Sequence, residues 1–208
     1  MNILLVDDHA VVRQGYASLL RAVLPAIDVR EAASGEDALL RVQEAVPNLV
    51  IMDVGLPGIS GLETLRRLRQ RLPQLRVLFF SMHDELPLVR QALDAGASGY
   101  LTKSSAPEVL IEAVRRILDG HAYIEQALAT ELAYTPGDQR WQGMTPRELE
   151  IFLMLAKGTP MRQIAEQLSI SSKTVSNHLT LLKSKLQVSS HAELVHLGID
   201  MGVVRVAG

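Results

Sequence analysis

The sequence predicts a doubly wound α/β fold with a five-stranded parallel sheet, followed by a small all-helical domain. Two observations favour this fold class: over residues 1–120 short apolar runs alternate with amphipathic stretches, and beyond residue 143 only helical patterns occur. Several of the apolar runs are uninterrupted by polar residues, which is typical of parallel strands covered on both faces. We therefore expect one domain over residues 1–120, a linker with a short helix over 121–143 and a second domain over 144–208.

The strands of the first domain are expected at residues 3–6, 29–32, 49–52, 77–80 and 99–101. The amphipathic patterns between and after them predict helices near residues 10–23, 35–45, 60–72, 85–95 and 106–119. Ser34 with Asp37, and Ser105 with Glu108, have the spacing of capping boxes. These pairs therefore mark the expected starts of the second and fifth helices.

The chain changes character after residue 120. A short amphipathic stretch at residues 124–134 precedes a segment at 135–143 that is rich in Pro, Gly and polar residues, as expected for a linker. Thr145-Pro146-Arg147-Glu148 then forms a capping box with Pro in the first helical turn. Further helices are expected to begin near Thr159, Ser171 and Ser190. The polar turn before Ser171, followed by a longer helix, predicts a helix–turn–helix.

The composition excludes several classes of protein. The 208 residues are 48% hydrophobic and 21% charged, the mixture of an ordinary globular protein. There is no cysteine, which excludes disulfides, thiol nucleophiles and cysteine-based zinc sites. No apolar run reaches the roughly 18 residues of a membrane helix, and the N-terminus lacks the basic start of a signal peptide. We therefore expect a cytoplasmic protein that does not bind membranes.

The charge distribution gives a mild indication of nucleic-acid binding. Residues 1–120 carry 13 basic and 15 acidic side chains, whereas residues 144–208 carry 7 basic and 5 acidic ones. A slightly basic domain behind a slightly acidic one is compatible with contact to nucleic acid at the C-terminal end.

Polar side chains end four of the expected strands. Asp7 and Asp8 follow the first strand, Asp53 the third, Ser81 the fourth and Lys103 the fifth. Because parallel strands end at one edge of the sheet, these groups are expected to meet there. Three carboxylates placed together need a cation, for which Mg²⁺ is suited, while the lysine and the hydroxyl suit a phosphate. The pattern predicts a phosphoryl-accepting site with Asp53 as the nucleophile.

Two other interpretations of these residues compete with a phosphoryl-accepting site. An isolated Asp after a strand is most often a helix cap or a solvated turn residue. Only the convergence of three carboxylates, a hydroxyl and an ammonium argues against that here. A phosphatase of the haloacid-dehalogenase type would also use an Asp nucleophile. Such enzymes carry a second Asp two residues later as a general acid, where this chain has Gly55. We therefore expect a phosphoryl acceptor that is not an enzyme, with at most slow autophosphorylation and autodephosphorylation.

The expected helix at residues 171–187 has one apolar and one polar face. At about 100° per residue its apolar side chains Val175, Leu179, Leu182 and Leu186 form one stripe. The opposite face carries Lys173, Ser176, Asn177, Thr180, Lys183, Ser184 and Gln187. An ordinary solvated face mixes acidic with basic residues, and this face has no acidic residue. Asn, Ser, Thr and Lys are side chains that read bases or hold phosphates in the major groove.

Residues 1–120 resemble the receiver domain of two-component response regulators, which has a flavodoxin/CheY-like fold. The matching segments are Leu5-Val6-Asp7-Asp8-His9, Met52-Asp53-Val54-Gly55-Leu56-Pro57-Gly58-Ile59-Ser60-Gly61, Phe80-Ser81 and Gly96-Ala97-Ser98-Gly99-Tyr100-Leu101-Thr102-Lys103. The resemblance implies that a sensor histidine kinase phosphorylates Asp53 and that Ser81 and Tyr100 are the switch pair. The implied Mg²⁺ ligands are Asp7, Asp8, Asp53 and the backbone carbonyl of Gly55, with Lys103 binding the phosphate.

Residues 144–201 resemble the LuxR-type helix–turn–helix of NarL/FixJ-class regulators. The matching blocks are Met144-Thr145-Pro146-Arg147-Glu148, Leu155-Ala156-Lys157-Gly158, Ile164-Ala165-Glu166-Gln167-Leu168, Ser171-x-Lys173-Thr174-Val175-x-Asn177-His178 and Lys183-x-Lys185-Leu186. The resemblance implies promoter DNA as a partner, RNA polymerase as a further one, and a homodimer in the active state. The final helix, expected over residues 190–203, either supports the dimer or closes the core.

The DNA contacts expected on these grounds are made by Lys173, Thr174, Ser176, Asn177, Thr180 and Lys183. Ser176 and Thr180 stand where members of the family often have Lys or Arg, so phosphate anchoring should be weaker and the salt dependence of binding shallow. The sequence as a whole predicts a two-domain transcription regulator whose promoter binding is controlled by phosphorylation of Asp53. A receiver that works without phosphorylation is the alternative left open.

Overall fold

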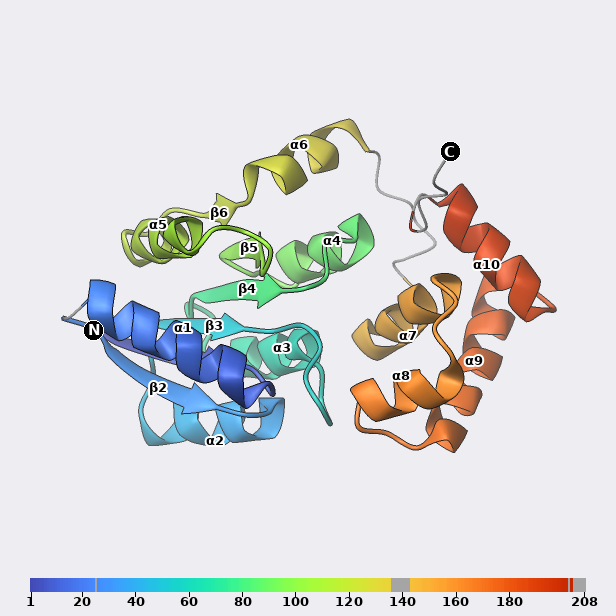
Figure 1. Ribbon diagram of the computed structural model, residues 1–208, viewed down its shortest axis with the longest axis horizontal. Coiled ribbons are helices and arrows are strands. Elements are labelled where there is room, and N and C mark those ends of the chain that lie inside the picture. Colours follow the sequence, from blue (N-terminus) through green and yellow to red (C-terminus); the bar gives the residue numbers. More distant parts are fainter. Residues whose placement is uncertain (25, 136–142, 202, 204–208) are drawn as a thin grey trace.

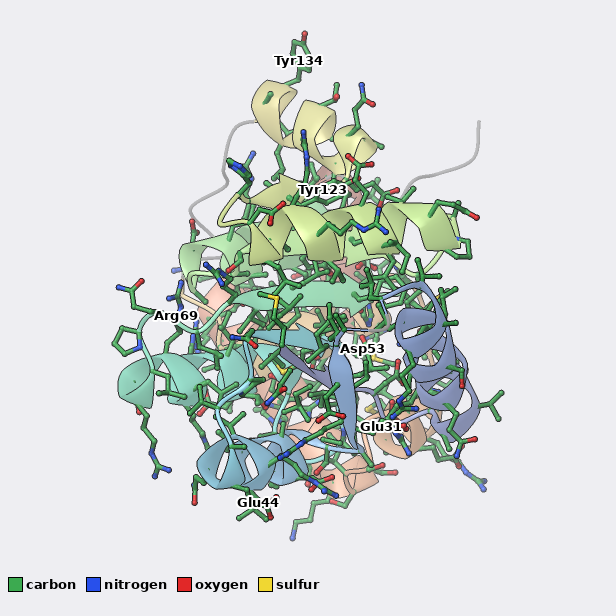
Figure 2. All side chains as sticks on the ribbon, turned by 90° about the vertical axis from the view of Figure 1, so that its left-hand side faces the viewer. Glu31, Glu44, Asp53, Arg69, Tyr123 and Tyr134 are labelled. Carbon is green, nitrogen blue, oxygen red and sulfur yellow. The ribbon has the colours of Figure 1, made fainter. Side chains whose placement is uncertain are left out.

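The structure is a computed structural model that describes residues 1–24, 26–135, 143–201 and 203. A parallel sheet lies between two layers of helices (Figures 1 and 2). Its strands are β1 Asn2–Val6, β2 Asp28–Ala32, β3 Leu49–Met52, β4 Val77–Ser81, β5 Gly99–Thr102 and β6 Tyr123–Ile124. Their order in the sheet is β2-β1-β3-β4-β5-β6, and every neighbouring pair is parallel. The doubly wound α/β fold class predicted from the sequence is confirmed.

The helices of this part are α1 Ala10–Val23, α2 Gly35–Glu44, α3 Gly61–Arg71, α4 Leu86–Asp94 and α5 Pro107–Leu118. Successive residues of a strand point to opposite faces of the sheet. Leu4 and Val6 accordingly pack in one buried cluster with side chains of α2, α3 and α4, whereas Ile3 and Leu5 pack in a second cluster with α1 and α5. The uninterrupted apolar strands follow from this burial on both faces.

Two details of the expected fold are wrong. The sheet has six strands, not five, because Tyr123 and Ile124 pair with Gly99 and Tyr100 of β5. Two residues are too short to form a recognisable apolar run. The fifth helix is capped by Ala106 without a side-chain cap, not by Ser105. The residue before a proline is held extended, so Pro107 fixes Ala106 as the residue that precedes the helix.

The remaining helices are α6 Gln126–Tyr134, α7 Pro146–Ala156, α8 Met161–Gln167, α9 Ser172–Leu186 and α10 His191–Asp200. Thr145 starts α7 with the predicted capping box: its hydroxyl accepts a hydrogen bond from the N–H of Glu148, whose carboxylate accepts one from the N–H of Thr145. β6 and α6 lie within the expected linker, while residues 136–142 of that linker lie outside the described residues. The last helix ends at Asp200, short of residue 203.

Helices α7 to α10 face the carboxyl ends of the strands, with α7 and α8 nearest to the sheet (Figure 1). Helix α6 follows β6 at the edge of the sheet and packs against α4 (Figure 1), and Tyr134 projects from its end (Figure 2). Within the described parts of the chain, no helix has the length and hydropathy needed to cross a membrane.

Candidate functional site

Four strands deliver polar side chains to one edge of the sheet. Asp7 follows β1, Asp53 follows β3, Ser81 ends β4 and Lys103 follows β5. The strand pairing continues up to these residues, because the N–H of Asp53 donates to the carbonyl of Val6 at 3.0 Å and the N–H of Lys103 donates to the carbonyl of Ser81 at 2.8 Å. The register of the sheet therefore fixes the backbone positions of the site residues independently of their side-chain contacts.

The carboxylate of Asp53 is the centre of a buried polar network. The hydroxyl of Ser81 donates to Oδ1 of Asp53 at 2.6 Å, and the ammonium of Lys103 contacts Oδ2. Nζ of Lys103 also lies 2.6 Å from Oδ2 of Asp7. Burial disfavours the charge of Lys103, but the two carboxylates more than compensate and raise its pKa above the ordinary value. Lys103 is therefore held as a cation against the residue expected to accept the phosphoryl group.

A glycine explains the tight loop after Asp53. A Cβ atom on Gly61, the first residue of α3, would lie 2.0 Å from the carbonyl oxygen of Asp53. The N–H of Gly61 donates to the carbonyl of Val54 at 2.9 Å, so the loop folds back against its own start. Glycine at position 61 is thus required by a close backbone approach.

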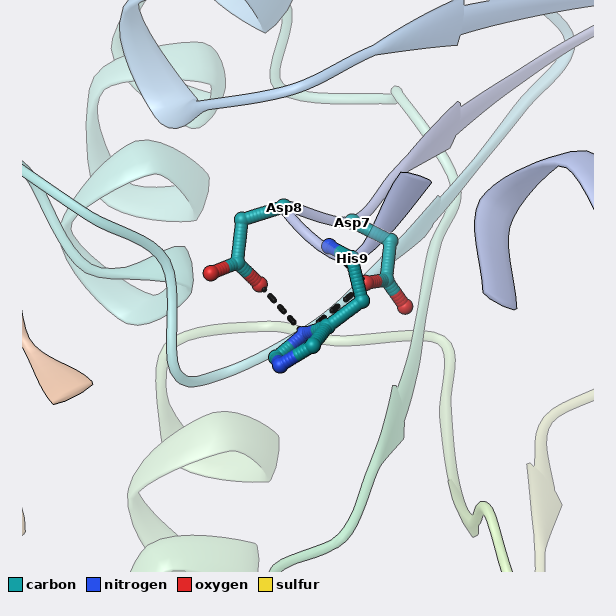
Figure 3. Close-up of side chains that lie close together, drawn as sticks. All are labelled: Asp7, Asp8 and His9. Carbon is teal, nitrogen blue, oxygen red and sulfur yellow. Dashed lines mark hydrogen bonds and ion pairs between the residues drawn. The ribbon is translucent and has the colours of Figure 1, made fainter. Parts of the chain in front are cut away.

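Asp7, Asp8 and His9 offer ligand atoms that all lie within 4.8 Å of one another (Figure 3). Oδ1 of Asp8 is buried and lies 2.9 Å from Nδ1 of His9, yet it accepts no hydrogen bond of ordinary geometry from a described residue. A buried carboxylate oxygen without a donor, beside a second carboxylate, fits a hard cation such as Mg²⁺. Among the described residues Asp53 is not a member of this group; its carboxylate contacts Lys103. His9 was not predicted from the sequence as a ligand, although it directly follows the acidic pair.

Tyr100 points into the interior near the same edge. Its side chain is fully buried, and its hydroxyl donates to the carbonyl of His83 at 2.8 Å. Burial, together with the charges of Glu85 and Asp53, raises the pKa of Tyr100 well above its ordinary value. The residue is therefore a neutral hydrogen-bond donor that ties β5 to the loop between β4 and α4.

The polar face of α9 is open to solvent. Lys173, Ser176, Asn177 and Thr180 are exposed, whereas Lys183 is half-buried. Val175 and Leu182 are buried, and Leu179 and Leu186 are partly buried against the core, as the apolar stripe predicts.

Thr174, the sixth residue expected to contact DNA, has a second role in α9. It lies in the first turn of the helix, where its hydroxyl is 2.8 Å from that of Ser171, the residue that caps the helix. The structure thus brings four of the six residues together on one exposed face of α9, with Thr174 and Lys183 at its borders.

Four functional candidates were not identified from the sequence. Arg147, Glu150 and Lys157 lie on or directly after α7, and Glu85 precedes α4. Arg147 and Lys157 stand in the sequence blocks that match the helix–turn–helix, but nothing in those blocks indicates a contact with the sheet domain. Their contacts depend on how distant parts of the chain pack together.

Comparisons with known proteins agree with this geometry. The family model described as the response regulator receiver domain matches residues 3–115, and that of the bacterial regulatory proteins of the luxR family matches residues 142–198. The transcriptional activator protein ExaE of Pseudomonas putida is 68% identical over the full length of both chains. The response regulator UvrY of Escherichia coli K12 is 35% identical, with 98% of this chain and 95% of that one covered.

Two solved structures share the fold. A two-component response regulator of the LuxR family from Aurantimonas sp. SI85-9A1 is 41% identical, with a TM-score of 0.61 over 64% of this chain and 94% of that one. RcsB of Salmonella enterica serovar Typhimurium, bound to the promoter P1flhDC in the presence of a phosphomimetic, has a TM-score of 0.66. It covers 94% of this chain and 96% of that one, and at 22% identity it bears on the fold alone.

Proposed function

Since the chain belongs to the LuxR-family two-component response regulators, which join a receiver to a DNA-binding helix–turn–helix, we propose that a phosphoryl group on Asp53 controls its binding to promoter DNA. The observation that carries this proposal is the buried contact of Asp53 with Lys103 and Ser81. A carboxylate placed between an ammonium and a hydroxyl is oriented for attack and has two groups that can neutralise a transferring phosphoryl group.

In the proposed reaction, a carboxylate oxygen of Asp53 attacks phosphorus in line with the bond that breaks. That bond is the P–N bond of a phosphohistidine on a sensor kinase or the P–O bond of a small acyl phosphate, and the histidine or the acid leaves. Lys103 stabilises the charge on the phosphoryl oxygens, and Ser81 donates a hydrogen bond to one of them. Asp7, Asp8, Asp53 and the carbonyl of Gly55 would hold Mg²⁺, which supplies further charge neutralisation.

The phosphoryl group adds a charge of about −1.5 to −2 at the sheet edge. Ser81 then leaves Asp53 for the phosphoryl oxygens, and the loop that carries the carbonyl bonded to Tyr100 moves with it. A coupling of about 1–3 kcal/mol between this change and DNA binding would alter promoter occupancy by about 5- to 150-fold. We propose that the active form is a homodimer that reads DNA with α9 and, like its relative ExaE, activates transcription.

The chain is proposed to act as a regulator without catalytic turnover. A phosphatase that uses an aspartyl nucleophile needs an acid to release its leaving group, and Gly55 stands at the place of that acid. RNA polymerase is the proposed partner of the active form at the promoter.

The test combines phosphorylation with DNA titration. Wild-type protein, Asp53→Asn and the control Asp28→Asn, which lies at the start of β2, are treated with acetyl phosphate and Mg²⁺. Phosphoprotein is measured on a phosphate-affinity gel. Binding to the DNA that lies upstream of the protein's own gene is measured by gel shift. Wild type and the control should be modified and should bind DNA more tightly when modified, whereas Asp53→Asn should do neither. Equal DNA affinity with and without phosphodonor would instead indicate a receiver that works without phosphorylation.

A further inference from the structure

Lys103 lies in a tight turn between β5 and α5. The N–H of Ser105 donates to the carbonyl of Thr102 at 3.2 Å, which closes a four-residue turn with Lys103 as its second residue. One side of this turn is fixed to β4, because the N–H of Lys103 donates to the carbonyl of Ser81 at 2.8 Å. The position of the lysine therefore also depends on how Thr102, the first residue of the turn, is held.

The side chain of Glu125 holds Thr102 from the other side. Its Oε2 accepts a hydrogen bond from the backbone N–H of Thr102 at 2.9 Å and a second one from the hydroxyl of the same residue at 2.8 Å. Thr102 is only 7% exposed, so water competes little for either donor. Because the acceptor is ionised, both bonds are stronger than bonds between neutral groups. One carboxylate oxygen thus fixes the backbone and the side chain of the residue that precedes Lys103.

This contact continues the pairing of β5 with β6 by one further bond. Alternate residues of a parallel strand bond to the same neighbouring strand. The N–H of Glu125 donates to the carbonyl of Tyr100 at 3.1 Å, and there the chain turns away from the sheet into α6. The N–H of Thr102, two residues further along β5, lies beyond the last paired residue of β6. The carboxylate of Glu125 accepts this N–H in place of a backbone carbonyl.

The hydroxyl of Thr102 carries the contact to the residues after Lys103. A hydroxyl has one proton to donate, and that of Thr102 goes to Glu125. The hydroxyls of Ser104 and Ser105, at 2.9 and 3.2 Å, therefore donate to the Thr102 oxygen. Both ends of the turn meet at this one hydroxyl, so a shift of the turn breaks bonds that depend on Glu125.

Glu125 has a fixed support of its own. It is the residue that precedes α6, which follows β6 directly and packs against α4 (Figure 1). Near the end of α6, the carbonyl of Leu132 accepts a hydrogen bond from Nη2 of Arg90 in α4 at 2.9 Å, and Leu128 between the two ends is buried. The helix is therefore anchored along its length, and its first carboxylate can hold a turn of the neighbouring strand.

A displacement of Lys103 would change the chemistry at Asp53. Nζ of Lys103 contacts Asp53 and lies 2.6 Å from Oδ2 of Asp7. In the proposed reaction this ammonium stabilises the transferring phosphoryl group, which requires that the cation is in place before the reaction starts. A misplacement of about 1 Å can lower a rate by about 100-fold. The expected Mg²⁺ ligands follow β1 and β3 and do not belong to this turn.

We propose that Glu125 is a positioning residue for Lys103: its carboxylate holds the turn after β5, so that the ammonium stays at Asp53 when the phosphoryl group arrives. Glu125 acts through Thr102 and is not itself a ligand of the phosphoryl group. The proposal rests on the proposed function of Asp53 and adds a residue from the segment that the sequence predicts as a linker. This segment therefore contributes to phosphoryl acceptance and does not only connect two domains.

The test measures how fast variants of the full-length protein accept a phosphoryl group. Glu125→Ala removes the acceptor, whereas Glu125→Gln keeps an amide oxygen at the place of Oε2, where both hydrogen bonds end. Glu112→Ala on the exposed face of α5 is the control. The initial rate with acetyl phosphate is measured on a phosphate-affinity gel over a series of Mg²⁺ concentrations. These data give the maximal rate and the Mg²⁺ concentration at half of that rate.

Glu125→Ala should lower the maximal rate about fivefold and leave the half-saturating Mg²⁺ concentration unchanged, because Lys103 moves while the metal ligands stay in place. Glu125→Gln should remain within about twofold of wild type, since it loses the charge of the acceptor and keeps its geometry. The control should match wild type. A variant that is damaged in its overall fold would instead need more Mg²⁺ to reach half of its maximal rate.

Thr102→Val is a second variant, because it removes the hydroxyl and keeps the backbone N–H. It should lower the maximal rate about twofold and add no loss to that of Glu125→Ala when the two are combined. A wild-type rate in Glu125→Ala, a raised half-saturating Mg²⁺ concentration, equal losses in Glu125→Ala and Glu125→Gln, or additive losses in the double variant would each overturn the positioning role.

Two further outcomes are distinguishable from these. If wild type itself takes no phosphoryl group, the proposed function of Asp53 fails, and the role of Glu125 fails with it. Circular dichroism shows which variants are folded. If Glu125→Ala is not, Thr102→Val decides the outcome, and an unchanged maximal rate in that variant overturns the proposal.

Discussion

At the sheet edge, Asp7, Asp53 and Lys103 are nearly buried and contact one another, whereas on α9 the side chains of Ser176 and Asn177 extend into solvent. The charges at the sheet edge stabilise each other within the folded chain. The polar groups of α9 gain their main partners only when DNA binds. Substitutions at the first region should therefore change both folding and signalling, while substitutions at the second should change DNA binding alone.

The largest difference between the regions is expected for Lys103→Met. The substitution leaves Asp7 and Asp53 buried together without their cation, and breaking a buried ion pair costs about 3–5 kcal/mol. Urea unfolding without Mg²⁺ should show a loss of that size. The matched change on α9, Lys173→Met, should alter the unfolding free energy by no more than about 0.5 kcal/mol. Equal losses in the two variants would remove the distinction between the regions.

Glu150 is a buried acidic residue in the same helical part of the chain as α9. It therefore tests whether burial, and not location in one part or the other, decides if a substitution changes the unfolding free energy. Its folded-state pKa of about 7 lies above its ordinary value of 4.5, so between these pH values the folded chain keeps a proton that the unfolded chain has lost. The contribution of Glu150 to the unfolding free energy of wild type should fall as pH rises from 4.5 to 7 and then level off. Glu150→Gln lacks this dependence, so its advantage over wild type should grow by up to about 1.4 kcal/mol per pH unit in that range.

Urea titrations at pH 5, 6, 7 and 8 measure this advantage. Glu85 does not interfere, because its pKa is lowered to about 2 and its stabilising contribution is lost only as pH falls below 4.5 toward 2. An advantage of Glu150→Gln that is constant with pH would contradict a raised pKa of Glu150.

The smallest effect on folding is expected at the reading face. Asn177→Ala should lower the affinity for cognate DNA by about 1–3 kcal/mol, since it removes a base contact, and should leave the unfolding free energy unchanged. Its salt dependence of binding should equal that of wild type. Lys173→Gln should instead reduce the slope of log K against log salt by about 0.9, as expected for one lost phosphate contact. Gel shifts at several salt concentrations distinguish the two roles, with His196→Ala on α10 as the control.

The sequence was informative where function depends on the ends of regular elements. Asp53, Ser81 and Lys103 could be placed together because parallel strands end at one edge, and the polar face of α9 could be placed because a helix has a fixed period. Each of these inferences needs only the local pattern and the rule for its element. The short strand β6 has no such pattern and was not predicted. The cap expected at Ser105 was wrong, because Pro107 makes Ala106 the residue that precedes the helix.

The contacts of α7 could not be inferred in the same way. Glu85 and Lys157 are 72 positions apart, and Arg147 and Gly58 are 89 apart. No periodicity relates such residues, because their meeting depends on the relative placement of two separately packed parts of the chain.

Gly61 illustrates a different kind of constraint on the phosphoacceptor. It has no side chain and takes no part in proton or phosphoryl transfer, yet the carbonyl oxygen of Asp53 fills the space where a methyl group would be. Any side chain at position 61 is thus excluded by steric conflict with the backbone of the acceptor, although the residue itself has no reactivity. A variant without this glycine would need a different backbone conformation of the whole turn before Asp53 could again be held in its present position.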